Sequence, residues 1–328
     1  MTKKTSMSKK YNLSGSTVMV TGGAGFIGSN LIPALLEKGV KKIKVLDNFY
    51  FGKAKNLPTD KRLEIIKFNL GVDNPRELKK QTKNVDFIFH LAAEKHNQSK
   101  NNPEKIITVN INGFFELLKA ASENHVKKIV FASSLYANGR MNKPRLKETD
   151  FPVPKTIYGI SKLTGENMLN YFHITAGLQY IALRFMFVYG PKQWSGTGYK
   201  SVIIKNFERI IANKNPLVCG DGKQILDYIY IDDAVAAIIK AVETNYGGEI
   251  INVGSGKAIS INQMSDIMIK ITGSSMKKKY READFTNKTY RVADTNKAKR
   301  ILKFSANTKL EKGLEKTFKW VKLNYKNK

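Results

Sequence analysis

The sequence has almost no cysteine, since Cys219 is the only one among 328 residues. A single thiol cannot form a disulfide within the chain, so packing alone must hold the fold together. Histidine is also scarce: the four histidines show no spacing that is typical of metal ligands. We therefore expect neither a disulfide nor a bound metal.

Long apolar runs are missing as well. No segment approaches the roughly 20 consecutive apolar residues that a membrane-spanning helix needs. Residues 1–10 carry lysines but no apolar stretch like that of a secretion signal. These absences predict a cytoplasmic protein with no membrane partner, preceded by a disordered basic tail over residues 1–12.

Acidic residues are few, with 27 Asp and Glu against 56 Lys and Arg, and the formal net charge is +29. Such an excess is compatible with nucleic-acid binding. However, the lysines are spread along the whole chain, and aromatic residues are not interleaved with basic ones as in a base-stacking groove. We therefore expect no nucleic-acid partner, and we expect the charge to attract small anionic ligands.

Apolar residues make up 42% of the chain, which is enough to build a sizeable core and two lobes. Along the first 185 residues, short apolar runs alternate with helical patterns. Strands are expected at 17–20, 42–46, 63–68, 85–91, 128–133 and 180–185, with long helices over 103–122 and 156–175. This alternation predicts an α/β fold with a doubly wound parallel sheet.

A glycine-rich loop, Thr21-Gly-Gly-Ala-Gly-Phe-Ile-Gly28, follows the first expected strand and opens a helix. The spacing of its glycines (Gly22, Gly25 and Gly28) lets the backbone approach a pyrophosphate and aims the helix N-terminus at it. Asp47 ends the next strand, where a carboxylate binds ribose hydroxyls and repels a 2′-phosphate. The sequence therefore predicts a Rossmann-type NAD site and favours NAD over NADP.

The regular alternation of strand and helix patterns ends after Gly190-Pro191. Loops, a helix over 201–213 and a turn at 220–222 follow there. We expect the NAD-binding Rossmann domain over residues 13–185, with 224–243 returning to it. Residues 186–223 and 244–328 are expected to form a smaller α/β lobe for the substrate.

Further cofactor contacts are expected in the helix after the glycine loop and just after the strands. The candidates are Phe26, Ile27, Asn48, Asn69, Leu70, Leu91, Ala92 and Ala93. Asn69 could bind the adenine amino group, whereas His90 is expected to be structural. Asn110, inside a long helix, either holds a loop or contacts the nicotinamide ribose region, and both alternatives stay open.

Tyr158-Gly-Ile-Ser-Lys162 places a phenol and an ammonium one helical turn apart. We expect Lys162 to lie beside Tyr158 and to lower its pKa from about 10 toward neutrality. Such a tyrosine can take a proton from an alcohol while a hydride leaves the carbon. Ser134 ends the fifth strand and could bind the same substrate oxygen, although a serine there could also be a simple turn cap.

Taken in order, these motifs resemble those of the extended short-chain dehydrogenase/reductases, in the nucleotide-sugar epimerase and dehydratase branch typified by UDP-galactose 4-epimerase. The resemblance extends over about residues 17–318. It includes Phe131-Ala-Ser-Ser134, Val188-Tyr-Gly-Pro191, Asn252-Val-Gly-Ser-Gly256 and Ala293-Asp-Thr-Asn-Lys-Ala298. It implies a tightly held NAD, a nucleotide-diphosphate sugar as substrate (UDP-sugars above all), and a homodimer formed through two helices of each subunit.

The resemblance also implies roles for single residues. Tyr158 matches the general base, Lys162 the residue that fixes the nicotinamide ribose, and Ser134 the hydroxyl partner. Arg281 and Asp284 fit the segment that anchors the nucleotide. The implied reaction is epimerisation, at C4, through a transient keto sugar, with hydride transferred to NAD and back.

Two positions depart from the family pattern. Phe187 stands where asparagine is common before Val-Tyr-Gly-Pro, and Leu226 stands where arginine is usual before Asp-Tyr. Two contacts to the substrate diphosphate are therefore expected to be missing, and a lysine such as Lys205 could compensate.

Other functions remain open. A 4,6-dehydratase is disfavoured, because Ser133-Ser134-Leu135 lacks the acid and base that elimination of water needs. A net reductase is not excluded. A non-catalytic NAD- or nucleic-acid-binding protein with this fold is favoured by the charge and by the two substitutions, but it has no physical need for the intact Ser134, Tyr158 and Lys162.

Overall fold

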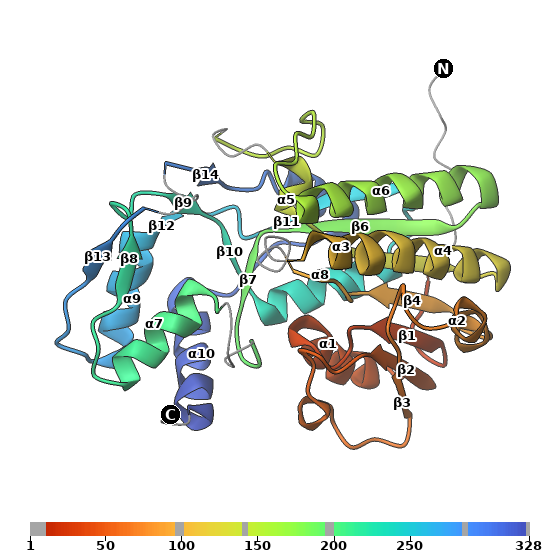
Figure 1. Cartoon of the computed structure of the whole chain (residues 1–328), viewed down its shortest axis with the longest axis horizontal. Coiled ribbons are helices and arrows are strands. Elements are labelled where there is room, and N and C mark those ends of the chain that lie inside the picture. The colour runs from red at the N-terminus through yellow and green to blue at the C-terminus, as the bar shows by residue number, and fades with distance from the viewer. Residues whose placement is uncertain (1–10, 96–101, 140–143, 194–199, 284–287, 326–328) are drawn as a thin grey trace.

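Seven parallel strands form the central sheet of the computed structural model, which describes residues 11–95, 102–139, 144–193, 200–283 and 288–325 (Figure 1). The strand order is β11-β6-β5-β4-β1-β2-β3. The bounds are β1 (Thr17–Thr21), β2 (Lys42–Asp47), β3 (Leu63–Lys67), β4 (Phe87–His90), β5 (Lys128–Ser134), β6 (Gln179–Phe185) and β11 (Glu249–Val253). The order reverses between β1 and β4, and ligands of such sheets bind outside the carboxyl ends of the strands at this point.

Helices cover both faces of this sheet. One face carries α1 (Phe26–Glu37) and α8 (Ile231–Glu243); the other carries α2 (Pro75–Thr82), α3 (Pro103–Ile106), the π-helical turn η2 (Ile107–Asn112), α4 (Gly113–Glu123) and α6 (Ile157–Ala176). Successive strand residues point to opposite faces, so Val18 and Val20 pack with α1 while Met19 packs with α4. Near-continuous apolar strands are what a sheet buried on both faces requires.

The second lobe lies on the opposite side of the molecule from β1–β3 (Figure 1). It contains α7 (Val202–Ile211), β8 (Leu217–Cys219), β9 (Ile225–Leu226), β12 (Ile259–Ser260), α9 (Ile261–Thr272), β13 (Lys279–Arg281), β14 (Tyr290–Arg291) and α10 (Leu310–Asn324). Here β9 pairs with both β12 and β14, and β8 pairs with β13. The short strands β7 (Phe187–Tyr189) and β10 (Tyr228–Tyr230) pair with each other between the lobes.

Short turns complete the element list. They are η1 (Ala54–Asn56), α5 (Leu135–Asn138) and η3 (Ala298–Leu302). No helix within the described ranges is long and apolar enough to span a bilayer.

The predicted Rossmann-type α/β fold with a smaller second lobe is confirmed, but the two lobes share the chain differently from the expected boundaries. β11 lies in the segment that was expected in the second lobe, yet it pairs with β6 from Glu249↔Ile181 to Val253↔Phe185. Conversely, β9 falls in the segment expected to return to the first lobe but belongs to a second-lobe sheet. Sheet pairing between distant segments decides both cases.

A buried ion pair ties α6 to the sheet. The Glu166 carboxylate accepts hydrogen bonds from Nε and Nη2 of Arg184 on β6, at 2.8 and 2.7 Å, and from the Ser133 hydroxyl on β5, at 2.6 Å. The side chains of Arg184 and Glu166 are 4% and 0% exposed. Removing one partner would leave the other charge buried and uncompensated.

We expect Arg184→Met to lower the free energy of unfolding by about 3–5 kcal/mol, because it leaves the Glu166 charge buried without a partner of opposite charge. The double variant Arg184→Met/Glu166→Met should lose less, since it removes both charges. Urea denaturation measures both effects, with Lys80→Met, which breaks an exposed pair with Glu77, as control. A loss in Arg184→Met no larger than in the control would show that the pair does not hold the helix.

Candidate active site

The glycine-rich loop between β1 and α1 packs tightly on the end of β4. Gly22 adopts a φ of +69° and donates its N–H to the Leu46 carbonyl at 2.7 Å. A Cβ at Gly22 would lie 2.7 Å from the Ala92 nitrogen, and a Cβ at Gly28 would lie 2.5 Å from the Gly22 carbonyl oxygen. The loop therefore requires glycine at both positions.

The first turn of α1 is prepared for an anion. Gly25 caps the helix without a side-chain hydrogen bond, and no acidic residue lies in the first turn. Phe26 and Ile27, the first two helical residues, are half-buried. The N–H groups at this end carry the positive pole of the helix, which is the arrangement that binds a phosphate. The loop and helix thus fit the pyrophosphate of a dinucleotide.

The Asp47 carboxylate lies between the glycine loop and the turn after β2. Its Oδ2 accepts the Ala24 N–H at 2.9 Å, and its Oδ1 accepts the Phe49 N–H at 2.8 Å. Burial raises the pKa of Asp47, while these two hydrogen bonds oppose the shift. Each carboxylate oxygen keeps further accepting capacity, so the group fits a ribose diol.

His90 has the structural role expected for it. Its Nδ1 lies 2.7 Å from the Thr21 hydroxyl, and its ring stacks on Phe114 with centroids 4.2 Å apart. Burial lowers the pKa of His90 well below the usual value, so the ring stays neutral.

The other predicted cofactor contacts gather at the carboxyl edge of the sheet. Asn48 follows β2, Asn69 and the buried Leu70 follow β3, and the half-buried run 91–93 (Leu91, Ala92 and Ala93) follows β4. The Asn48 side chain accepts the Tyr50 N–H at 3.0 Å, and the main chain of Asn69 donates to Asp73 at 2.8 Å. The structure thus brings them to one edge, and their contacts to the cofactor stay predictions.

Asn110 holds a loop, which was one of its two expected roles. Its Oδ1 accepts the Glu94 N–H at 2.8 Å, and its Nδ2 donates to the Glu94 carbonyl at 3.0 Å and to the Ser161 hydroxyl at 3.1 Å. These bonds fix the segment after β4 against α6. A contact between Asn110 and the cofactor remains a prediction.

The three predicted catalytic residues meet beyond the carboxyl end of β5. Thr156 caps α6 by accepting the Gly159 N–H at 3.0 Å, which places Tyr158 in the first turn and Lys162 one turn later. The Ser134 hydroxyl accepts the Tyr136 N–H at 3.3 Å and is near enough to the Tyr158 phenol to lower its pKa. Ser134 and Lys162 are 8% and 3% exposed, whereas Tyr158 is half-buried.

The expected lowering of the pKa of Tyr158 is wrong for the protein alone. Burial raises the pKa of Tyr158 to about 12, and the Ser134 hydrogen bond opposes this only in part. The Lys162 ammonium donates to the Ala132 carbonyl at 2.8 Å, and burial lowers the pKa of Lys162 to about 7. In the protein alone the Lys162 ammonium is thus directed at the main chain, and it does not offset the rise in the pKa of Tyr158.

The structure describes one of the two substrate-binding residues predicted in the second lobe. Arg281 lies on β13, exposed, with its Nε 2.9 Å from the Cys219 sulfur, whereas Asp284 lies outside the described residues. Both substitutions in the family pattern, Phe187 and Leu226, line the junction of the lobes as apolar side chains. The role of Arg281 in binding substrate stays a prediction.

Sequence reasoning missed one charged residue near the site. Arg291 is 1% exposed, and its Nη1 lies 3.5 Å from the Tyr136 hydroxyl. The Tyr136 ring lies 5.9 Å from that of Tyr158, at 76°. The sequence offered one indication of this buried arginine, which is its position directly before the apolar pair Val292-Ala293.

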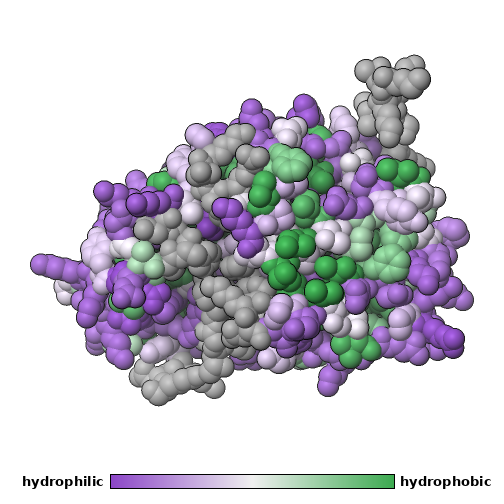
Figure 2. Space-filling model, turned by 45° about the horizontal axis from the view of Figure 1, so that its top comes forward, coloured by the Kyte–Doolittle hydropathy of each residue, from purple (hydrophilic) through white to green (hydrophobic). Residues whose placement is uncertain are grey.

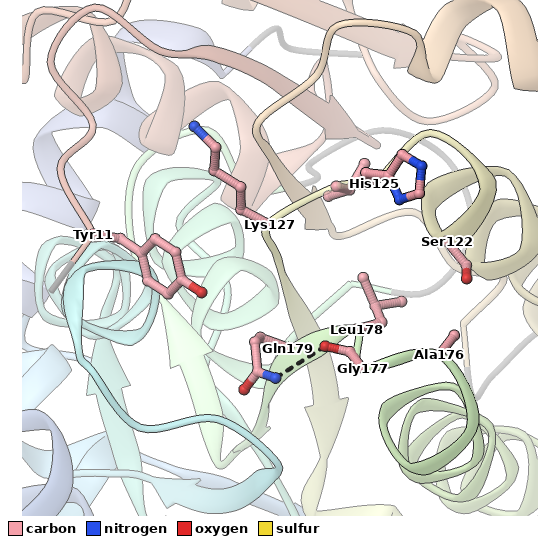
Figure 3. Close-up of a pocket in the computed structure, with 9 residues that line it drawn as sticks. Tyr11, Ser122, His125, Lys127, Ala176, Gly177, Leu178 and Gln179 are labelled. Carbon is pink, nitrogen blue, oxygen red and sulfur yellow. Dashed lines mark hydrogen bonds between the residues drawn. The ribbon is translucent and has the colours of Figure 1, made fainter. Parts of the chain in front are cut away.

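An open pocket lies at the opposite edge of the sheet, near the amino ends of β5 and β6 (Figure 3). It is lined by Tyr11, Ser122, His125, Val126, Lys127, Ala176, Gly177, Leu178 and Gln179. The catalytic group lies at the carboxyl ends of these strands, so this pocket belongs to a different part of the molecule. In the described part of the chain no cluster of His, Cys, Asp or Glu is arranged to hold a metal ion.

Three features of this edge of the sheet are typical of dinucleotide-dependent enzymes that use tyrosine as a base. They are a helix start that can bind phosphate, a carboxylate suited to a ribose diol, and a Ser-Tyr-Lys group beyond the end of β5. Comparison with known proteins narrows this class. Residues 18–254 match the family model described as the NAD dependent epimerase/dehydratase family. The chain belongs to this family, and its cofactor is NAD.

Relatives and solved structures agree with this assignment. A UDP-glucuronate 4-epimerase of Thermodesulfobacterium geofontis is 32% identical over 93% of this chain and 96% of its own length. A UDP-N-acetyl-alpha-D-glucosaminuronate decarboxylase of Bacillus cytotoxicus is 33% identical over 92% and 96%. The solved UDP-N-acetylglucosamine 4-epimerase from Methanobrevibacter ruminantium, in complex with UDP-N-acetylmuramic acid, has a TM-score of 0.90 and 32% identity over 95% of this chain and all of its own. The predicted NAD-dependent enzyme of the nucleotide-sugar epimerase branch is confirmed.

We expect Asp47→Ala to reduce the preference for NAD over NADP by about tenfold or more, because the carboxylate no longer binds the ribose diol or repels a 2′-phosphate. Titration of the purified protein with each dinucleotide measures the two affinities. Asp60→Asn, which removes a carboxylate paired with Arg62 elsewhere in the same lobe, is the control. An unchanged ratio of the two affinities would remove Asp47 from the cofactor site.

Proposed function

We propose that this protein epimerises a UDP-sugar at C4 through a transient keto sugar. The observation that carries the proposal is the position of Tyr158 beside Ser134 at the end of β5, with Lys162 one turn further along the same face of α6. Ser134 ends β5, which pairs with β4, while the glycine loop follows β1 and Asp47 ends β2, so these residues all lie along the carboxyl edge of one sheet. We therefore assign the base, its hydroxyl partner and the cofactor to this edge.

Each residue has a task in this cycle. Tyr158 takes the proton of the C4 hydroxyl, and Ser134, which is within hydrogen-bonding reach of the phenol, orients the same oxygen. Lys162 holds the nicotinamide ribose. Bound NAD supplies a hydride acceptor that later serves as the donor, so the reaction has no net redox change. Return of the hydride to the opposite face requires the keto sugar to rotate, which a firmly held nucleotide and a loosely held sugar allow.

We expect Tyr158→Phe to lower turnover about 100- to 10,000-fold while it leaves NAD binding and the fold intact, because it removes only the proton acceptor. Turnover is measured by NMR with UDP-glucose, UDP-N-acetylglucosamine and UDP-glucuronate, together with NAD content and circular dichroism. Tyr171→Phe, an exposed tyrosine on the same helix, is the matched control. Wild-type turnover in Tyr158→Phe would exclude the proposed base.

The same NMR panel separates the alternatives. An epimerase gives the C4 epimer without accumulating NADH. A net reductase or dehydrogenase changes the amount of NADH with each turnover, a dehydratase releases water to give a deoxy keto sugar, and a decarboxylase releases carbon dioxide from a uronate. We further propose that the protein acts in the cytoplasm on small molecules and that nucleic acid is not its partner.

We also propose that the protein is a homodimer joined through α4 and α6. Several large apolar side chains on these helices are exposed: Phe115 (41%), Ile160 (43%), Tyr171 (59%) and Ile174 (66%). At 3.6 residues per turn, the three on α6 lie along one side of the helix. Figure 2 shows hydrophobic residues gathered near the centre of the face in view, with hydrophilic residues around them. A second copy of the same face would cover this patch symmetrically.

The double variant Tyr171→Glu/Ile174→Glu should be monomeric, because it places charges in the proposed apolar interface. Sedimentation velocity measures the change relative to a dimeric wild type. Leu323→Glu, which changes an 86% exposed leucine on α10, is the control and should remain dimeric. A monomeric wild type, or a double variant that dimerises as well as the control, would contradict this interface.

A further inference from the structure

Arg291 carries a buried charge for which the described part of the fold supplies no carboxylate. It is the largest of the almost fully buried side chains, and its Nε has no hydrogen-bond partner. Among the described residues Arg291 donates a side-chain hydrogen bond from Nη1 to the Tyr136 hydroxyl, at 3.5 Å, and its guanidinium lies near the rings of Tyr136 and Phe187. A guanidinium remains charged at physiological pH, and its removal from water is unfavourable unless an anion or several hydrogen bonds compensate.

Arg291 lies directly opposite Leu226, one of the two positions that depart from the family pattern. β14 pairs in parallel with β9, with Arg291 opposite Leu226, and the Asp227 N–H donates to the Arg291 carbonyl at 3.0 Å. Residues paired in this way project to the same face of the sheet. Leu226 stands where the family pattern has an arginine. Arg291 places a guanidinium directly opposite this position, on the neighbouring strand β14. Lys205, the expected substitute, is instead an exposed residue of α7.

Arg291 is also close to the reacting centre. Its Cζ lies 5.7 Å from the Tyr136 ring centroid and 6.0 Å from that of Phe187. Tyr136 in turn meets Tyr158 edge-on, with centroids 5.9 Å apart. A single aromatic ring therefore separates the buried charge from the proposed base.

We propose that Arg291 binds the anionic oxygens of the nucleotide sugar beside the reacting ring, and that Tyr136 and Phe187 form the aromatic walls of this subsite. This proposal rests on the proposed function, and it assigns to Arg291 a part in the substrate specificity of the enzyme. The oxygens belong either to the diphosphate or to a carboxylate at C6 of a uronic acid. Both present paired oxygens that match the guanidinium fork, and the two rings favour the cation through their faces.

The test compares Arg291→Met with wild type, both loaded with NAD, by calorimetric titration with UDP, UDP-glucose, UDP-glucuronate and inorganic pyrophosphate. We expect the variant to lose about tenfold to hundredfold in affinity, as for a lost charged hydrogen bond. Equal losses for UDP and both sugar nucleotides identify the diphosphate as the bound group. A loss confined to UDP-glucuronate identifies the sugar carboxylate.

Two further variants complete the design. Arg300→Met removes an exposed arginine from η3 and should leave every affinity within about twofold of wild type. Arg291→Lys keeps a charge but loses the planar fork, so its affinities should fall between those of wild type and Arg291→Met.

Thermal unfolding of the protein without substrate separates binding from a structural role. Arg291→Met should be at least as stable as wild type, because it removes an uncompensated buried charge. A less stable variant with unchanged affinities would show that Arg291 is structural and would overturn the proposal. Unchanged affinities at full stability, or a wild type that binds none of the four anions, would overturn it too.

The outcomes also separate this proposal from the proposed function. Anion binding that depends on Arg291, without turnover of any sugar nucleotide, would leave the subsite standing and remove the epimerase. Turnover that depends on Tyr158, with unchanged affinities in Arg291→Met, would remove only the subsite.

Discussion

The buried Glu166 carboxylate is the contact on which the geometry of the site depends. Tyr158, Lys162 and Glu166 follow one another at intervals of four residues, so they share one face of α6. Glu166 is bound to Ser133 on β5 and to Arg184 on β6, which fixes the third turn of the helix to two neighbouring strands. The first two turns are thereby held over the carboxyl end of β5.

Close packing adds to this constraint. A Cβ at Gly165 would lie 2.8 Å from the Phe131 ring, so α6 approaches the sheet where a larger residue would not fit. Asn110 joins the same helix, through Ser161, to the segment after β4. The base and the cofactor edge of the sheet are therefore parts of one connected, buried assembly.

Burial also sets the chemistry of the base. The shift in the pKa of Tyr158 from 10.0 to about 12 means that the protein alone disfavours the phenolate by about 3 kcal/mol relative to water. A tyrosine in this state does not lose its proton to solvent. The proposed proton transfer therefore needs the bound cofactor and substrate to offset this rise in the pKa of Tyr158.

Much of the site followed from local patterns in the sequence. The loop at 21–28 and the Tyr158/Lys162 spacing are fixed by a strand-loop-helix unit and by one turn of helix, so both appear within a few residues. β11 and Arg291 depend on pairing between segments far apart in the chain, which periodicity does not reveal. The pKa direction of Tyr158 was missed because it depends on burial, which spacing alone does not give.

The lobe junction shows how the family scheme is altered in this chain. Apolar side chains at 187 and 226 replace polar ones, while a guanidinium enters from the neighbouring strand β14. The large ring of Tyr136 lies between this charge and the base. Under the proposal made above, Arg291 would take over at this junction the part in holding the substrate that the family pattern gives to position 226.

The fate of the hydrogen at C4 tests the central claim most directly. A UDP-sugar substrate labelled with deuterium at C4 is incubated with the NAD-loaded protein, and the product is analysed by NMR and mass spectrometry. Hydride transfer to NAD and back predicts an epimer that retains the deuterium at C4. Loss of the label to water, or to NADH released from the protein, would contradict the account.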